Sequence, residues 1–76
     1  MKVVMYSTPT CGYCNIAKDF FDENGIEVKV FDVSVDEEKR QELIEKSGQM
    51  GVPVIEIGEE VVIGFDQAKI TQLLGL

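Results

Sequence analysis

The sequence contains no histidine, no tryptophan and only two cysteines, and these shortages exclude several classes of protein. A structural zinc site needs four Cys or His ligands, so the chain cannot form one alone. Two cysteines also cannot build the multi-bridge framework that stabilises many chains shorter than about 80 residues. Packing of apolar side chains must therefore hold the fold, and 45% of the 76 residues are hydrophobic.

Positive charge and long apolar runs are scarce as well. Seven Lys and Arg residues face fourteen Asp and Glu residues, which gives a net charge of −7. Nucleic acids and anionic membranes attract clusters of Lys and Arg side chains, so neither is an expected partner. No apolar run approaches the roughly 20 residues of a membrane span, and the opening MKVVMYST is too short for a signal peptide. We expect a cytoplasmic protein with a single domain over residues 1–76.

Apolar periodicity predicts seven structural elements. Strands are predicted over residues 2–6, 26–33, 52–57 and 61–63. Helices are predicted over residues 14–24, between the capping residue Ser34 and Ser47, and after the capping residue Asp66. The order β-α-β-α-β-β-α, with the first two strands parallel and the last two antiparallel, predicts an α/β thioredoxin-like fold. Its mixed four-stranded sheet is flanked by three helices, and the residues expected in its core include Phe20, Phe21 and Phe31.

Cys11-Gly12-Tyr13-Cys14 stands where the first strand gives way, through a loop that contains Pro9, to the first helix. Free backbone N–H groups and the helix dipole at that point favour a thiolate at Cys11. Cys14, one turn further on, is expected to stay protonated until it reacts. This asymmetry predicts that Cys11 attacks a disulfide and that Cys14 resolves the mixed disulfide. A buried, inert pair is the alternative, but the Pro, Gly and Thr neighbours favour an exposed loop edge.

Two further segments offer backbone groups to a ligand. A cis Val52–Pro53 bond would turn the Val52 backbone outward, where it could pair with an extended peptide, whereas base frequencies alone favour an ordinary trans bond. Gly64, ahead of the helix cap Asp66, offers N–H groups that could hold a carboxylate, and a simple capped helix is equally compatible. Phe65 fits either a core position or an exposed contact with a partner.

These motifs together resemble the glutaredoxin family, and within it the small NrdH-type redoxins. The resemblance covers nearly the whole chain and rests on residues 6–14, on Val52-Pro53 and on Gly64-Phe65-Asp66. It implies that Cys11 is the nucleophile and that the Val52–Pro53 bond is cis. The residues that it places beside glutathione or another substrate are Thr8, Tyr13, Gln49, Val52, Pro53, Gly64, Phe65 and Asp66.

The resemblance implies a monomeric thiol–disulfide oxidoreductase that reduces protein disulfides or glutathione mixed disulfides. Glutathione is then a co-substrate, and no cofactor or metal is tightly bound. Thr8 stands where glutathione users carry a base, and Gly12 where glutaredoxins commonly carry proline. NrdH-type members take electrons from thioredoxin reductase and pass them to ribonucleotide reductase. Glutathione and thioredoxin reductase therefore both stay open as electron donors.

Two other classes of function are compatible with the same motif. A pair of chains could bridge a [2Fe–2S] cluster with Cys11 thiolates and glutathione, and Gly12 beside Cys11 relaxes the loop in the permissive direction. A redox-inert adaptor is the other class, and it predicts that Cys11 reacts no faster than an ordinary thiol.

Overall fold

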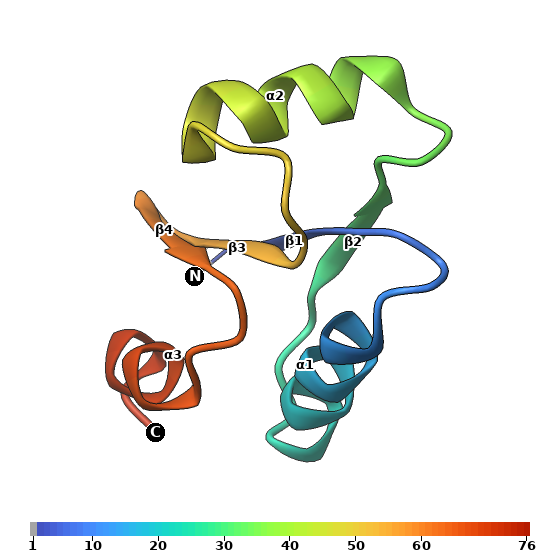
Figure 1. Ribbon diagram of the computed structural model, residues 1–76. Helices are drawn as coiled ribbons and strands as arrows, with labels where there is room; N and C mark the ends of the chain where they lie inside the picture. The colour runs from blue at the N-terminus through green and yellow to red at the C-terminus, as the bar shows by residue number, and fades with distance from the viewer. Residues whose placement is uncertain (1) are drawn as a thin grey trace.

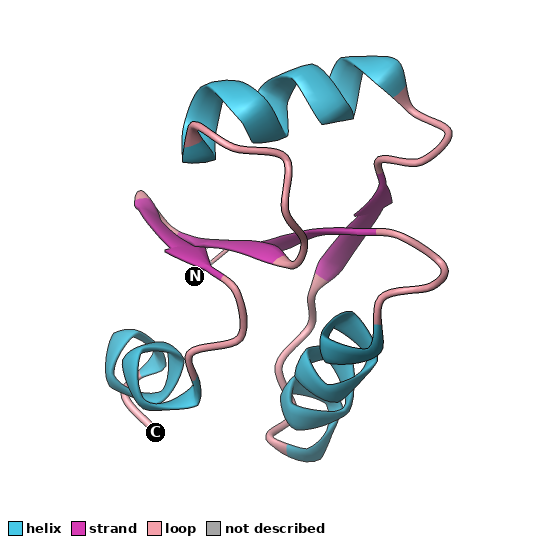
Figure 2. Cartoon of the chain, viewed as in Figure 1, coloured by secondary structure: helices cyan, strands magenta, loops and turns pink. Residues whose placement is uncertain are grey.

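The computed structural model describes residues 2–76, which fold in the predicted order β-α-β-α-β-β-α (Figures 1 and 2). Met1, the first residue of the predicted single domain, lies outside the described residues. The strands are β1 (Val3–Ser7), β2 (Lys29–Asp32), β3 (Val54–Ile57) and β4 (Glu60–Ile63). The helices are α1 (Gly12–Glu23), α2 (Glu37–Ser47) and α3 (Gln67–Leu74).

The strands form one mixed sheet in the order β2-β1-β3-β4. Strand β1 pairs parallel with β2 and antiparallel with β3, and β3 pairs antiparallel with β4. Helices α1 and α3 cover one face of the sheet, and α2 covers the other (Figure 1). The predicted thioredoxin-like arrangement of strands and helices is confirmed.

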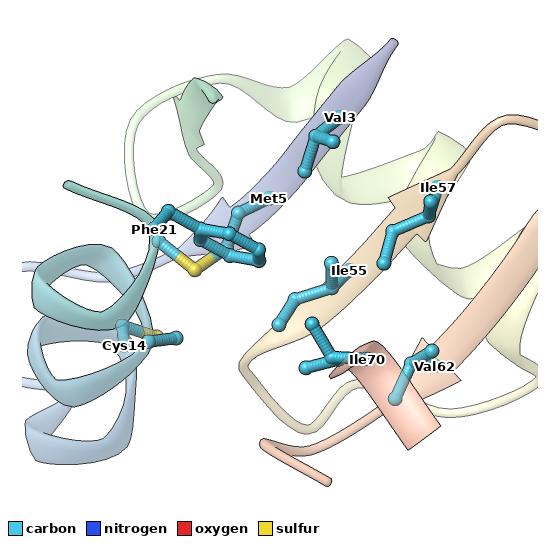
Figure 3. Packing of buried hydrophobic residues seen from close by; sticks show 9 residues of the cluster. Val3, Met5, Cys14, Phe21, Ile55, Ile57, Val62 and Ile70 are labelled. Carbon is cyan, nitrogen blue, oxygen red and sulfur yellow. The ribbon is translucent and has the colours of Figure 1, made fainter. Parts of the chain in front are cut away.

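Side chains of the central strand alternate between two cores, one on each face of the sheet. Met5 points toward α1 and α3, where it packs with Phe21 and Ile70 (Figure 3). Tyr6 points the other way and packs with Leu43 of α2. Because β1 is covered on both faces, all five of its residues are buried, which explains its continuous apolar sequence.

The predicted cap of α2 is wrong. The cap is Asp36, whose Oδ1 accepts a hydrogen bond from the Lys39 backbone N–H at 3.1 Å. Ser34 lies in the preceding turn, where its backbone N–H donates to Asp32 Oδ1 at 2.9 Å. Asp32 thus holds Ser34 outside the helix, and the carboxylate of Asp36 satisfies the first turn instead.

The predicted strand 26–33 is longer than the strand that forms. Strand β2 begins at Lys29, while the residues before it connect α1 to the edge of the sheet. Val30, predicted to face inward, is 40% exposed because it lies on an edge strand and lines an open cleft beside α1. Of the three phenylalanines expected in the core, Phe21 is fully buried, whereas Phe20 and Phe31 are half-buried at its margins.

Candidate active site at the start of helix α1

Cys11 is the N-cap of α1, as its position after the Pro9 loop predicts. Its backbone is extended, with φ −84° and ψ 107°, and its N–H donates to the Thr8 carbonyl at 3.2 Å. Its sulfur accepts a hydrogen bond from the Cys14 backbone N–H at 3.1 Å. The sulfur therefore occupies the place that a serine or aspartate oxygen takes in an ordinary helix cap.

Cys11 and Cys14 are joined by a disulfide, with their Cα atoms 5.3 Å apart. Their environments differ. Cys14 is 3% exposed and belongs to the core beneath α1, whereas Cys11 is half-buried at the edge of that core. An incoming molecule can therefore reach the sulfur of Cys11 far more easily than that of Cys14.

The Val52–Pro53 peptide bond is cis, so the trans alternative is wrong here. The Pro53 carbonyl accepts a hydrogen bond from the Gly64 N–H at 2.8 Å, which joins two of the predicted motifs directly. Val52, Phe65 and Cys11 all pack against the margin of the core between the sheet, α1 and α3. Three segments that are far apart in the sequence thus pack against the same core.

The side-chain amide of Gln49, expected to contact a ligand, is instead bonded to the backbone. Its Oε1 accepts from the Gly51 N–H at 2.7 Å, and its Nε2 donates to the Gly51 carbonyl at 3.2 Å. The side chain therefore braces the loop that leads into the cis proline. A Cβ added at Gly51 would lie 2.5 Å from Gln49 Oε1, so this short glycine segment fits the amide closely.

Thr8 and Tyr13 have different surroundings. Thr8 lines a cleft of about 330 Å³ together with Cys14 and Lys18, while the Tyr13 ring is 67% exposed. Lys18 is not among the residues predicted for the site. The four-residue spacing between Cys14 and Lys18 is the signal that could have placed them together, because residues so spaced are neighbours on a helix.

The third motif builds the start of α3. Gly64 has φ +79°, a left-handed conformation that favours glycine. Asp66 caps the helix and its Oδ1 accepts from the Lys69 N–H at 3.2 Å. The half-buried Phe65 ring packs against Phe20, with centroids 5.7 Å apart, and so lies at the margin of the core.

Residues 3–62 match the family model for glutaredoxin. The chain belongs to the glutaredoxin family. A glutaredoxin-like 8.6 kDa protein encoded in a rubredoxin operon of Clostridium pasteurianum is 36% identical over 72 residues, covering 95% of this chain and 96% of that protein. Glutaredoxin 3 of Escherichia coli is 33% identical over 65 residues, covering 86% and 78%.

Solved structures agree with this assignment. A mutant of a thioredoxin-like protein superposes with a TM-score of 0.91 at 35% identity, covering 97% of this chain and 95% of that one. Membership of the glutaredoxin family, with the Cys11–Cys14 pair in place, makes the chain a thiol–disulfide oxidoreductase.

The titratable groups of this glutaredoxin with resolved pKa shifts lie on the far face of the sheet, around α2. A hydrogen bond to Glu56 raises the pKa of Lys46 well above its usual range, with help from the Tyr6 hydroxyl. Hydrogen bonding between Lys39 and Glu42 raises the pKa of the lysine and lowers that of the carboxyl. These pairs belong to the scaffold and not to the redox site.

Within residues 2–76, no three His, Cys, Asp or Glu side chains gather in a way that could hold a metal ion. None of the helices there is long and apolar enough to cross a membrane. A [2Fe–2S] cluster shared between two chains would take one Cys11 ligand from each chain. A single chain does not test such a site, so the cluster stays a prediction.

Proposed function

We propose that Cys11 is the attacking thiolate and Cys14 the resolving thiol in the reduction of protein disulfides. The observation that carries this proposal is the difference between the two cysteines. Cys11 caps the helix and is accessible, whereas Cys14 is 3% exposed beneath it. In the reduced protein, the Cys14 N–H that now meets the Cys11 sulfur would stabilise a negative charge there.

The reaction transfers two electrons in two exchanges. The Cys11 thiolate attacks one sulfur of the substrate disulfide, which forms a mixed disulfide and releases the first substrate thiolate. Cys14 then loses its proton and attacks the Cys11 sulfur, which closes the Cys11–Cys14 bond and releases the second thiolate. The substrate is reduced and the protein is left in its disulfide form.

Backbone groups of Val52, whose side chain packs against the same core as Cys11, are the proposed contacts for the substrate chain, since the Gly64 N–H is already bonded to the Pro53 carbonyl. Three side chains expected to recognise glutathione are poorly suited to that role. The Gln49 amide is bonded to Gly51, the Asp66 carboxylate caps α3, and Thr8 carries no charge. We therefore propose that glutathione is a weak co-substrate and that protein disulfides are preferred.

Single cysteine variants test the roles. Cys11→Ser should abolish reduction of every disulfide. Cys14→Ser should lose reduction of protein disulfides but keep reduction of glutathione mixed disulfides, because a second glutathione can resolve the intermediate. Full reduction of a protein disulfide by Cys14→Ser would contradict the assignment, and so would activity in Cys11→Ser.

The electron donor is tested by comparing turnover with glutathione plus glutathione reductase against turnover with thioredoxin reductase. Thioredoxin reductase should support the faster turnover, since this chain lacks a base at Thr8 to attract glutathione. Faster turnover with glutathione would overturn the proposed preference while leaving the cysteine roles intact. Ribonucleotide reductase is the proposed acceptor to add to that assay.

A further inference from the structure

Helix α1 carries two apolar stripes, and only one of them is covered. Cys14, Ala17 and Phe21 face the core and are buried. Tyr13, Ile16 and Phe20 repeat at the spacing of a second stripe, and Tyr13 and Ile16 are 67% and 52% exposed. An exposed apolar stripe that begins within the redox motif itself suggests a surface that is covered during function.

This second stripe leads into a hollow of about 250 Å³ between α1 and the start of α3. The hollow, called here the α1–α3 groove, is lined by Ile16, Asp19, Phe20, Glu23, Phe65 and Gln67. The packed rings of Phe20 and Phe65 contribute its apolar part. The groove shares helix α1 with the redox motif, since Ile16 follows Cys14 by two residues, and its Phe65 packs against the same core as Cys11.

The charges of the groove are of one sign. Its two charged lining residues, Asp19 and Glu23, are both acids. The last turn of α1 carries no basic residue of its own, so the negative end of the helix dipole adds to these charges. A basic side chain from another molecule would be favoured there, beside the apolar surface of Ile16 and Phe65.

We propose that the α1–α3 groove docks a segment of the substrate protein that carries an apolar side chain and a Lys or Arg close to the attacked cysteine. The proposal rests on the proposed function and adds a preference among substrates to it. The occupant is an ordinary protein segment, held by its side chains while Cys11 attacks its disulfide.

The length of α1 sets where those side chains must lie. Each helical residue advances about 1.5 Å, so Ile16 lies about 6 Å and Glu23 about 16 Å along the axis from Gly12. An extended peptide covers about 3.3 Å per residue. The apolar side chain is therefore expected about two to four residues from the substrate cysteine, and the base about five residues from it.

The test uses the reduced protein in single turnover with three disulfides, followed by acid quenching and chromatography. Two are dimeric peptides joined through one cysteine, each with leucine three residues after it. One peptide carries arginines at the fifth and sixth positions after the cysteine, and the other carries glutamates there. The third probe is bis(2-hydroxyethyl) disulfide, which is too small to reach the groove.

The wild-type protein should reduce the arginine peptide about tenfold faster than the glutamate peptide. The double variant Asp19→Asn/Glu23→Gln should reduce the arginine peptide about fivefold more slowly, because each exposed ion pair adds only modestly. The matched control Asp22→Asn/Glu27→Gln changes the net charge equally through two exposed acids outside the groove. An equal loss in both double variants would mean general attraction to an acidic protein and would overturn the proposal.

The apolar part has its own control. Ile16→Ser should slow both peptides about threefold, whereas Val35→Ser, an 80% exposed valine on the α2 side of the chain, should slow neither. Unchanged peptide rates in Ile16→Ser would overturn docking at this stripe. A dimer that forms at working concentrations and is lost in Ile16→Ser would assign the groove to a second copy instead. Failure of the wild type to reduce any of the three disulfides would count against the proposed function itself.

Discussion

At the residue scale, a substitution of Gly12 should change the stability of the helix start without changing the reactivity of Cys11. Gly12 is the first residue of α1, its φ is not left-handed, and no heavy atom lies within 4 Å of an added Cβ. Gly12→Ala should raise stability by about 0.5–1 kcal/mol, because alanine has fewer unfolded conformations to lose. The midpoint pH of Cys11 alkylation should stay unchanged, since the N–H that meets its sulfur belongs to Cys14.

Gly25 provides the matched control for this substitution. An added Cβ there also meets open space, but the residue has φ +67°. Gly25→Ala should therefore destabilise the protein by about 1 kcal/mol, because only glycine adopts a left-handed conformation without strain. Chemical denaturation of the reduced proteins measures both changes. Equal signs for the two variants would contradict the explanation by backbone conformation.

The Gln49–Gly51 brace is tested by a double-mutant cycle. Gln49→Ala removes two exposed hydrogen bonds and should cost about 1 kcal/mol in stability. Gly51→Ala should cost a similar amount, because its Cβ displaces the amide. In the Gln49→Ala background, Gly51→Ala should be almost neutral. Additive losses in the double variant would show that the two residues act independently.

Residue positions were partly predictable from the sequence. The position of Cys11 follows from a strand, a proline-containing loop and a helix in succession, which are local signals. The partner of the Gln49 amide is not predictable in this way, because a free amide and one bonded to a nearby backbone look the same in a sequence. The cis Val52–Pro53 bond followed only from the family resemblance, since local chemistry favours trans.

At the scale of elements, the two possible caps of α2 make different predictions. Asp36→Ala should lower stability by about 1 kcal/mol, because its carboxylate bonds the Lys39 N–H. Ser34→Ala removes only the exposed bond from the Ser34 hydroxyl to Asp32, keeps the bond from the backbone N–H, and should cost a few tenths of a kcal/mol. Thermal unfolding of both variants measures the difference. A larger loss for Ser34→Ala would restore the capping box that the sequence suggests.

Boundaries of elements were less predictable than their order. The spacing Ser34 to Glu37 fits a capping box, yet Asp36 competes for the same helix start. The alternation over residues 26–33 continues past the point where strand pairing begins at Lys29. In both cases, the sequence pattern fits more than one start residue for the helix or strand. Contacts with the rest of the chain decide which start residue is used.

At the scale of the whole molecule, one contact fastens α2 to the sheet across 40 residues of sequence. Lys46 Nζ lies 2.6 Å from Glu56 Oε2 and donates to the hydroxyl of Tyr6 at 3.2 Å. Tyr6 is 1% exposed, so its hydroxyl has little access to water. Lys46→Met should therefore lower stability by about 1–2 kcal/mol, most of it from the unpaired hydroxyl.

Two controls separate this effect from a general loss of charge. Lys69→Met removes an exposed lysine of α3 and should change stability by less than about 0.5 kcal/mol. In a Tyr6→Phe background, Lys46→Met should cost much less, because no buried hydroxyl is left unpaired. An undiminished cost in that background would contradict the role given to Tyr6.

The same contact predicts a pH dependence. The folded pKa of Lys46 is raised, mainly by Glu56. The contribution of Lys46 to the stability of the protein is therefore complete at any pH below the unfolded pKa of about 10.4. The contribution is lost as pH rises from there through the folded pKa. The stability difference between wild type and Lys46→Met should thus stay constant from about pH 6 to 10 and shrink above that range. A difference that shrinks below pH 9 would contradict this linkage.

The division of the sheet into two covered faces has a practical consequence for handling the protein. The cysteine pair and the α1–α3 groove belong to the side of α1 and α3, while α2 packs on the opposite face (Figure 1). A tether attached to the exposed Gln41 of α2 would leave the dithiol pointing into solution. The protein could then be fixed to a bead or an electrode in one orientation, with every molecule presenting its reactive sulfur outward.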